Sequence, residues 1–471
     1  MSKPLVLNQD RLFPADPTLR AIARRLYAEV KDLPIISPHG HTNPQWFADD
    51  TPFPDPANLL IVPDHYIFRM LYSHGVTLEQ LGIARKDGGA VEADPRKVWR
   101  VFAEKFYLFR GTPTRIWTDH VLAEVFGVET QLTPETADDI YDQMEDCLTK
   151  PEFRPRALFE RFGIEAMATT ESPLDDLRHH KKIHESDWSG RVVTAFRPDA
   201  VVDPDFEGFA DSVATLGEIT GEDCASWSGY LNALAARRAY FKQHGCTSTD
   251  HGHPSAATAD LAKVDCETLL SKALAGTCTA DEAERFRAQM LTEMSRMSLD
   301  DGLVMQIHPG SFRNHNAHLF EHFGRDMGAD IPTCTEYVHA LKPMLDRFGN
   351  EPDLTIILFM LDETAQGREM APLAGHYPAL RLGPPWWFFD SAEGMLRFRR
   401  NVTETAGFYN TVGFNDDTRA FLSIPSRHDV ARRVDCAYLA ELVADHRLEE
   451  DEAHEVAVDL AYNLVKAAYK L

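Results

Sequence analysis

The sequence has 471 residues, of which 44% are hydrophobic and 26% are charged; this ordinary globular usage excludes wholesale disorder, collagen and coiled coil. The 73 acidic and 48 basic residues give a formal charge of −25, which argues against nucleic acid or an anionic membrane as the main partner. An anionic substrate is still compatible with this balance, because a local group of arginines can lie in an acidic protein.

Cysteine usage and the first residues indicate a cytoplasmic protein. The seven cysteines are odd in number and contain no CxxC pair, which is typical of reduced thiols rather than a disulfide framework. The opening stretch, MSKPLVLNQDRLFPADP, lacks the apolar core of a secretory signal, and no run of about 18 apolar residues could span a membrane. We therefore expect a cytoplasmic location and no membrane partner.

Short apolar runs alternate with helical patterns along most of the chain. Most runs are too uniformly apolar to be half-exposed, as expected for parallel strands buried on both faces. Strands alternating with helices indicate βαβ units, and eight strands favour an α/β fold of the (β/α)8 TIM-barrel type. The predicted strands are residues 33–38, 164–170, 191–196, 245–249, 303–307, 354–360, 380–383 and 411–414.

The segments between the strands have the spacing of amphipathic helices. Three such patterns are Phe206, Phe209, Val213 and Leu216; Trp227, Leu231 and Leu234, ending near Gly245; and Tyr337, Val338, Leu341 and Leu345, ending before Gly349. Residues 65–160 interrupt the alternation and predict a helical insertion after the first strand. We divide the chain into an N-terminal segment with the first strand (1–64), the insertion (65–160), and the remaining barrel with a helical C-terminal tail (161–471).

The sharpest local motif is IISPHGHTNP, which places His39 and His41 two residues apart after the first strand. Period-2 geometry puts both side chains on one face, which at the carboxyl end of a barrel strand looks into the active-site mouth. Two imidazoles at this spacing suit one divalent metal, commonly zinc. The alternative is a loop with two exposed histidines, and the recurrence of HGH at 251–253 shows that the pattern is not specific by itself.

A second motif, GFNDDTRAF, ends the eighth predicted strand. Asp417 and Arg419 share a face, and Asp417 could complete a His-His-Asp metal site because strand eight neighbours strand one in a barrel. The alternative is an ordinary surface turn in which Asp416 and Asp417 cap a helix. The His-x-His motif on the neighbouring strand favours the functional interpretation.

The motif PDHYIFRML opens the insertion. His65 and Tyr66 could close over the barrel mouth as acid–base groups. An equally balanced alternative is a helix N-terminus capped by Asp64, with Tyr66 half-buried.

Other predicted strand ends carry polar or aromatic groups. Arginine guanidinium groups match carboxylates bidentately, so three arginines converging on one mouth would indicate an anionic ligand, although each alone could be a structural salt-bridge partner. Trp386 lies in a tryptophan pair that could form a wall or a platform for a sugar. The residues concerned are Arg197, Asp250, His308, Arg313, Trp386, Trp387 and Asp390, with Arg419 from the eighth strand.

Together these residues resemble the uronate isomerase (glucuronate isomerase) family of the amidohydrolase superfamily. The resemblance covers nearly the whole chain and rests on nine motifs in order: HGHTNP, PDHYIFRML, GTPTRIWTDH, TTESPLDDL, FRPD, CTSTDHG, HPGSFRNHN, WWFFD and DDTRAFLS. It implies an enzyme that interconverts D-glucuronate with D-fructuronate and D-galacturonate with D-tagaturonate. Two departures, Glu171-Ser172 for two acidic residues and Thr418 where serine is commoner, concern substrate preference more than reaction type.

The resemblance also implies site residues and a cofactor. His39, His41 and Asp417 match ligands of one divalent metal, which we expect to be Zn²⁺, bound weakly or not strictly required. Because the fourth strand offers Asp250 rather than a lysine or glutamate, a binuclear centre is not favoured. The positions matching the substrate site are His65, Tyr66, Arg197, Asp250, Arg313 and Arg419.

Aldose–ketose isomerisation requires ring opening and one base that reaches both C1 and C2. We assign this base to Asp417 or Tyr66, with Asp417 favoured, and ring opening to Asp250 with a histidine near the metal. Arg197 and Arg419 hold substrate oxygens. The alternatives are a mononuclear zinc amidohydrolase and a non-catalytic sugar-acid-binding barrel; the expected partner is a small sugar acid, in a homo-oligomer.

Overall fold

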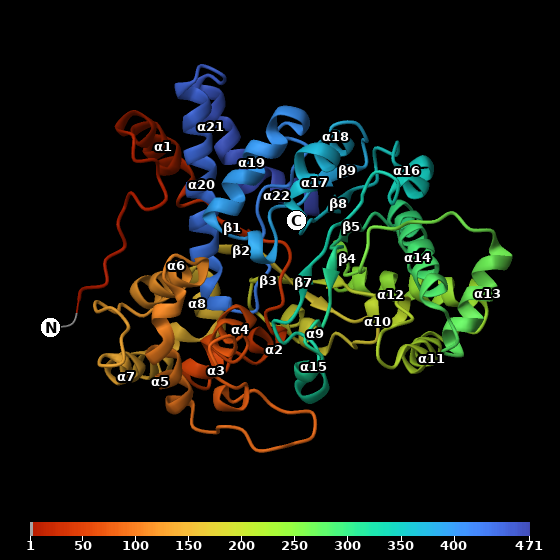
Figure 1. Ribbon diagram of the computed structural model, residues 1–471, viewed down its shortest axis with the longest axis horizontal. Helices are drawn as coiled ribbons and strands as arrows, with labels where there is room; N and C mark the ends of the chain where they lie inside the picture. The colour runs from red at the N-terminus through yellow and green to blue at the C-terminus, as the bar shows by residue number, and fades with distance from the viewer. Residues whose placement is uncertain (1–2) are drawn as a thin grey trace.

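The computed structural model describes residues 3–471 and has an α/β barrel-like architecture (Figure 1). One parallel sheet contains seven strands in chain order, so that each helical crossover adds the next strand at the same edge. This curled sheet confirms the predicted TIM-barrel fold class. Its strands are β1 (Ile35–Ser37), β2 (Ile164–Glu171), β3 (Arg191–Phe196), β4 (Ser248–His251), β5 (Val304–Ile307), β8 (Ile356–Leu358) and β9 (Leu380–Leu382).

The predicted strand at 411–414 is wrong in extent. Only Thr411 pairs with the sheet, in an isolated parallel bridge to Leu382 of β9. Gly413 has a φ of +74°, which ends the extended backbone that a strand needs, and a Cβ there would lie 2.4 Å from the Leu460 carbonyl oxygen. The eighth position of the barrel is therefore mostly irregular chain.

Helices surround the sheet and bury its outer face. The predicted helix at 337–345 begins later, at Lys342, because Pro343 suits a first helical turn. Tyr337 lies before that helix, buried, with its N–H donating to Glu369. These helices are α9 (Arg178–His184), α10 (Asp199–Val202), α11 (Phe209–Thr220), α12 (Trp227–Gln243), α13 (Lys263–Leu274), α14 (Ala280–Asp301), α16 (Lys342–Phe348), α17 (Glu363–Ala365), α18 (Ala371–Ala374) and α19 (Ala392–Ala406).

The region between β1 and β2 is helical, and its helices begin at Pro44, before residue 65. It has its own apolar core, in which Trp99 and Phe102 are completely or almost completely buried. The predicted apolar positions Val98, Phe106, Phe109, Ile140 and Met144 belong to the same core. The helices are α2 (Pro44–Asp49), α3 (Pro56–Leu60), α4 (His65–Tyr72), α5 (Pro95–Lys105), α6 (Pro113–His120), α7 (Ala137–Leu148) and α8 (Pro155–Arg161).

The tail is helical, as predicted, and its longest helix, α20 (Ile424–Ala444), runs between the insertion and the barrel (Figure 1). Helix α1 (Pro17–Val30) packs against α20 and α21 (Glu450–Val458). In α22 (Leu464–Tyr469), the Tyr469 hydroxyl donates to Gln306 of β5 and so covers one end of the barrel interior. Within residues 3–471, no helix is both long and apolar enough to cross a membrane.

Strand register decides which side chains enter the barrel. Asp250 of β4 pairs with Gln306 of β5, whereas His251 pairs with Ile307. Ile307 belongs to the core between the sheet and the helices, and Gln306 contacts Tyr469 inside the barrel. Because alternate residues of a strand face opposite sides, Asp250 points into the barrel and His251 points away from it.

Between β5 and β8 the chain forms an excursion over the carboxyl ends of the strands. A short antiparallel pair, β6 (Ser311–Phe312) with β7 (Ile331–Pro332), encloses α15 (Ala317–Phe323). This excursion supplies part of the cavity wall described next.

Candidate active site

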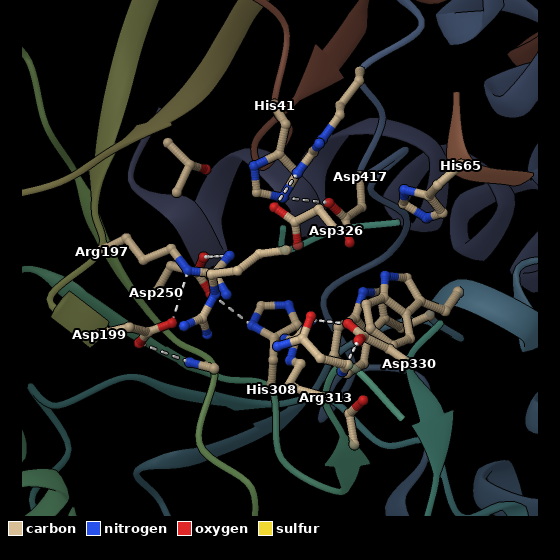
Figure 2. Close-up of a pocket in the computed structure, with 18 of the residues that line it drawn as sticks. His41, His65, Arg197, Asp199, Asp250, His308, Arg313, Asp326, Asp330 and Asp417 are labelled. Carbon is tan, nitrogen blue, oxygen red and sulfur yellow. Dashed lines mark hydrogen bonds and ion pairs between the residues drawn. The ribbon is translucent and has the colours of Figure 1, made fainter. Parts of the chain in front are cut away.

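The structure brings His39, His41 and Asp417 together at the carboxyl ends of the strands. Figure 2 shows His41 beside Asp417. The Nε2 atoms of His39 and His41 lie 3.4 and 3.2 Å from the same oxygen, Asp417 Oδ1. The His41 N–H donates to the Thr418 carbonyl at 3.0 Å, which joins the eighth barrel position to the segment after β1. Asp417 has a φ of +38°, a conformation that a non-glycine residue keeps only when its surroundings hold it there.

A second group lies beside the first and shares His39. His308, directly after β5, places Nδ1 2.8 Å from Oδ1 of Asp250, and its ring stacks on His39 with centroids 4.9 Å apart. All three side chains are buried. The sequence marks His308 only as a polar residue at the end of a predicted strand, and its position directly after a buried strand is the one local signal.

Each predicted substrate arginine is paired with a carboxylate. Arg197 donates to Asp250 at 3.0 Å and to Asp199 at 2.9 Å, and Asp199 also accepts the Gly252 N–H at 3.1 Å. Asp199 lies in the FRPD motif, two residues after Arg197, so its spacing was a usable signal. These contacts fix the Arg197 guanidinium at the edge of the cavity.

The other two arginines pair with residues of the excursion between β5 and β8. Arg313 donates to Asp330 at 2.8 Å and Arg419 donates to Asp326 at 3.0 Å (Figure 2). Neither aspartate follows a predicted strand, and nothing in the local sequence marked them. The three arginines thus approach the same cavity from three different parts of the chain.

Trp386 and Trp387 form part of the cavity wall. Their ring centroids are 4.6 Å apart, and the Trp386 ring meets His308 edge-on at 4.8 Å. The Arg313 guanidinium lies 4.8 Å from the Trp387 ring centroid, a cation–π arrangement that helps to place Arg313.

His65 and Tyr66 begin α4 and also line the cavity, so both sequence interpretations apply to them. The Asp64 carboxylate caps the helix by accepting the Tyr66 N–H at 2.8 Å. Burial lowers the pKa of His65 to about 3 and raises the pKa of the Tyr66 phenol well above its usual value. At neutral pH the imidazole is therefore neutral and the phenol protonated.

The carboxylates of the cavity floor are ionised. Burial opposes the charge of Asp417, but the adjacent His39 and His41 outweigh it and hold the pKa well below its usual range. Burial likewise opposes ionisation of Asp250, whose pKa is held low by Arg197 and His308. The floor therefore offers two carboxylates among imidazoles, Asp250 fully buried and Asp417 with 12% of its side chain exposed.

The donor set fits a divalent metal. One ligand atom from each of His39, His41 and Asp417 lies within 4.8 Å of the others. Bonds of 2.0–2.2 Å to one tetrahedral zinc ion would place two ligand atoms about 3.3 Å apart, close to the separations between Asp417 Oδ1 and the two nitrogens. Asp417 Oδ1 is also buried without a hydrogen-bond partner.

These groups line one cavity of about 940 Å³ at the carboxyl ends of the strands. A barrel with polar residues from several strand ends in such a cavity defines the chain as a barrel enzyme with its active site at the usual end. Sequence and structure comparisons agree with this assignment. A family model described as glucuronate isomerase matches residues 16–469.

The uronate isomerase of Phenylobacterium zucineum (strain HLK1) is 66% identical over 471 residues, covering 100% of this chain and 98% of that protein. The crystal structure of glucuronate isomerase from Caulobacter crescentus has 61% identity and a TM-score of 0.98, covering 99% of this chain and 98% of that one. Uronate isomerase from Thermotoga maritima has 30% identity and a TM-score of 0.91, covering 98% and 99%. The chain belongs to the glucuronate isomerase family and is an isomerase.

Proposed function

We propose that the chain interconverts D-glucuronate with D-fructuronate and D-galacturonate with D-tagaturonate. The observation that carries this proposal is the combination of two carboxylates on the cavity floor, Asp250 and Asp417, with three guanidinium groups on its wall. The floor provides a base for carbon acid chemistry, and a guanidinium suits the uronate carboxylate. Membership of the glucuronate isomerase family supports the same substrate class.

In the proposed reaction, Asp250 and His308 assist opening of the sugar ring by exchanging protons with the anomeric hydroxyl and the ring oxygen. Asp417 then removes the C2 proton. The electron pair of the broken C–H bond forms the C1–C2 double bond, and the π pair of the C1 carbonyl moves to O1, which takes up a proton to give a cis-enediol. O2 then loses its proton and forms the C2 carbonyl, while the electron pair of the C1–C2 double bond takes the proton from Asp417 at C1, which produces the ketose. Tyr66, which burial keeps protonated, is the donor beside Asp417 rather than the base.

Arg197 and Arg419 hold the oxygens on which negative charge develops, and Arg313 is placed to bind the substrate carboxylate. His65, neutral at physiological pH, orients a hydroxyl by hydrogen bonding. Trp386 shapes the wall and excludes water from one face of the substrate.

His39, His41 and Asp417 are the residues that would hold a divalent metal, and we propose Zn²⁺. A bound ion would supply electrostatic stabilisation of substrate oxygens. Isomerisation needs no metal-activated water, so we expect the protein residues to perform the proton transfers.

The test is to incubate the purified protein with D-glucuronate, and then D-galacturonate, in D₂O and to follow the C2 proton by ¹H NMR. Loss of that signal with new ketose resonances is the expected result. If both signals persist with zinc supplied, the isomerase proposal fails. Hydrolysis of neutral amides would then identify the alternative, a mononuclear zinc amidohydrolase.

A further inference from the structure

Arg427, on α20, lies directly behind the cavity and is 1% exposed, although it is not among the residues that line the cavity. Its Nη1 donates to Asp390 Oδ2 at 2.6 Å and to the Asp416 carbonyl oxygen at 3.3 Å. Its Nε donates to the Ser423 hydroxyl at 3.1 Å. One guanidinium therefore joins the segment that follows the tryptophan pair to the turn that carries Asp417.

The faces of the same guanidinium meet aromatic rings of the insertion. Its central carbon lies 3.6 Å from the Trp117 ring centroid and 5.5 Å from that of Tyr66, and the two rings meet edge-on at 5.8 Å. Such contacts are strongest when the cation is removed from water, as it is here. Arg427 thereby reaches the insertion helices α4 and α6 as well.

The hydrogen bond from Arg427 to the Asp416 carbonyl lies next to Asp417, the residue of the site with a strained backbone. That carbonyl belongs to the peptide that joins Asp416 to Asp417, whose φ is +38°. A left-handed conformation at a non-glycine residue is strained and persists only where neighbouring groups restrain it. A planar, fixed set of donors is suited to restrain a peptide and a carboxylate at once.

Another buried ion pair provides the contrast. Arg238 of α12 is completely buried, donates twice to Asp301 at 2.6 and 2.9 Å and once to Ser298 at 2.9 Å. Its hydrogen-bond partners belong to α14, in the outer helical layer, and its guanidinium also lies 6.0 Å from the Phe196 ring centroid of β3. Arg427 instead distributes its donors over segments that carry site residues.

We propose that Arg427 is a positioning residue for the isomerase reaction: it holds the Asp416–Asp417 peptide and the Tyr66 ring in the arrangement that proton transfer requires. This inference rests on the proposed function. Asp390, which accepts the 2.6 Å hydrogen bond from Nη1, is the side chain that keeps the guanidinium in place.

The test compares Arg427→Lys with Arg238→Lys in the full-length protein. Lysine keeps the charge but cannot donate in one plane to a carboxylate, a hydroxyl and a carbonyl. A misplacement of about 1 Å can lower turnover about 100-fold, so Arg427→Lys should lower kcat by about that factor. KM should change by less than about threefold, because Arg197 and Arg313 are untouched. Arg238→Lys should lower Tm about as much as Arg427→Lys does, but its kcat should stay within about twofold of the wild-type value.

Asp390→Asn and Asp301→Asn form a second pair, which also serves if a lysine variant does not fold. We expect about a tenfold lower kcat for Asp390→Asn only, by loosening of the guanidinium. Equal kcat values within both pairs would overturn the inference. So would a fall in kcat/KM for Arg427→Lys that comes wholly from a higher KM. In either case, turnover by the wild type would leave the proposed function standing. A wild-type protein that leaves both uronates unchanged overturns the proposed function and the inference with it.

Discussion

The tripeptide His-Gly-His occurs twice at strand ends, and the two copies have different surroundings. At 39–41, both imidazoles face Asp417 across the cavity floor. At 251–253, His251 Nε2 shares a hydrogen bond with Thr249 at 2.9 Å, and both nitrogens of His253 are buried without a partner. Burial lowers the pKa of His251 to about 3, so it stays neutral. The same three residues thus form a polar site in one place and part of the packing in another.

The difference follows from strand register and from the partner on the neighbouring segment. In β4 the residue that enters the barrel is Asp250, so the next residue, His251, must face the helices. The second copy contributes its glycine to the site instead. A Cβ at Gly252 would lie 2.5 Å from Arg197 Nη2 and 2.8 Å from Asp199 Oδ2, whereas one at Gly40 would have only ordinary contacts, the nearest at 3.4 Å.

The largest expected effect is on kcat and comes from removing the charge of Asp417, the carboxylate that faces His39 and His41. Asp417→Asn should lower kcat at least about 10³-fold, because the amide cannot accept the C2 proton. Steady-state kinetics on both uronates measures it. Asp435→Asn, which alters a buried carboxylate paired with Arg399, controls for stability. A near-normal kcat in Asp417→Asn would show that the base assignment is wrong.

Metal affinity should depend on the His-Gly-His at 39–41 and not on the one at 251–253. His41→Asn should weaken Zn²⁺ binding at least about 100-fold, since even loss of an outer partner of a metal ligand costs 10–100-fold. The matched change in the second copy, His253→Asn, should leave the affinity unaltered. Equilibrium dialysis with metal analysis measures both, independently of activity. Equal losses in the two variants would contradict the assignment of ligands.

The two glycines offer a smaller contrast. Gly252→Ala should push the Arg197 guanidinium away from its present position and raise KM about tenfold, the equivalent of roughly 1.4 kcal/mol. Gly40→Ala should change KM less than about twofold. Kinetics with saturating and limiting uronate distinguishes these outcomes, and similar KM values for both variants would remove Arg197 from substrate binding.

The smallest expected effect is on stability and concerns β2, next to the first His-Gly-His. The Thr170 hydroxyl donates to the Gly40 carbonyl, and Glu171 is the next residue in the chain. Burial raises the pKa of Glu171 from 4.5 to about 7. The folded protein therefore holds a proton that the unfolded chain releases, so stability falls as pH rises from 4.5 to 7. The full penalty above pH 7 is about 3 kcal/mol.

Glu171→Gln should remove this penalty, so its advantage in unfolding free energy over the wild type should grow between pH 5 and pH 8. Urea titrations at these two pH values measure the change. Glu165→Gln, on the same strand, should instead weaken the protein at both pH values, because Glu165 pairs with Lys466. A Glu171→Gln advantage that does not vary with pH would contradict the assigned titration.

Much of the fold could be predicted because its signals are local. Seven of eight strands and most helices follow from apolar periodicity, which reports burial within a few residues. The failure at 411–414 has a tertiary cause: TVGF is apolar enough for a strand, but Gly413 lies against Leu460, and that close approach selects its left-handed backbone.

The site divides in the same way. The fold class, the family resemblance and the side chains available at the strand ends can be predicted from short stretches of sequence, since motifs and hydrophobic patterns are local. Three relations are visible only in the folded chain: which His-Gly-His meets Asp417, that His308 joins Asp250, and that Asp326 and Asp330 hold the outer arginines. The tertiary structure also places Arg427 behind the site. These relations depend on strand register and on contacts between segments far apart in the chain, which no local pattern records.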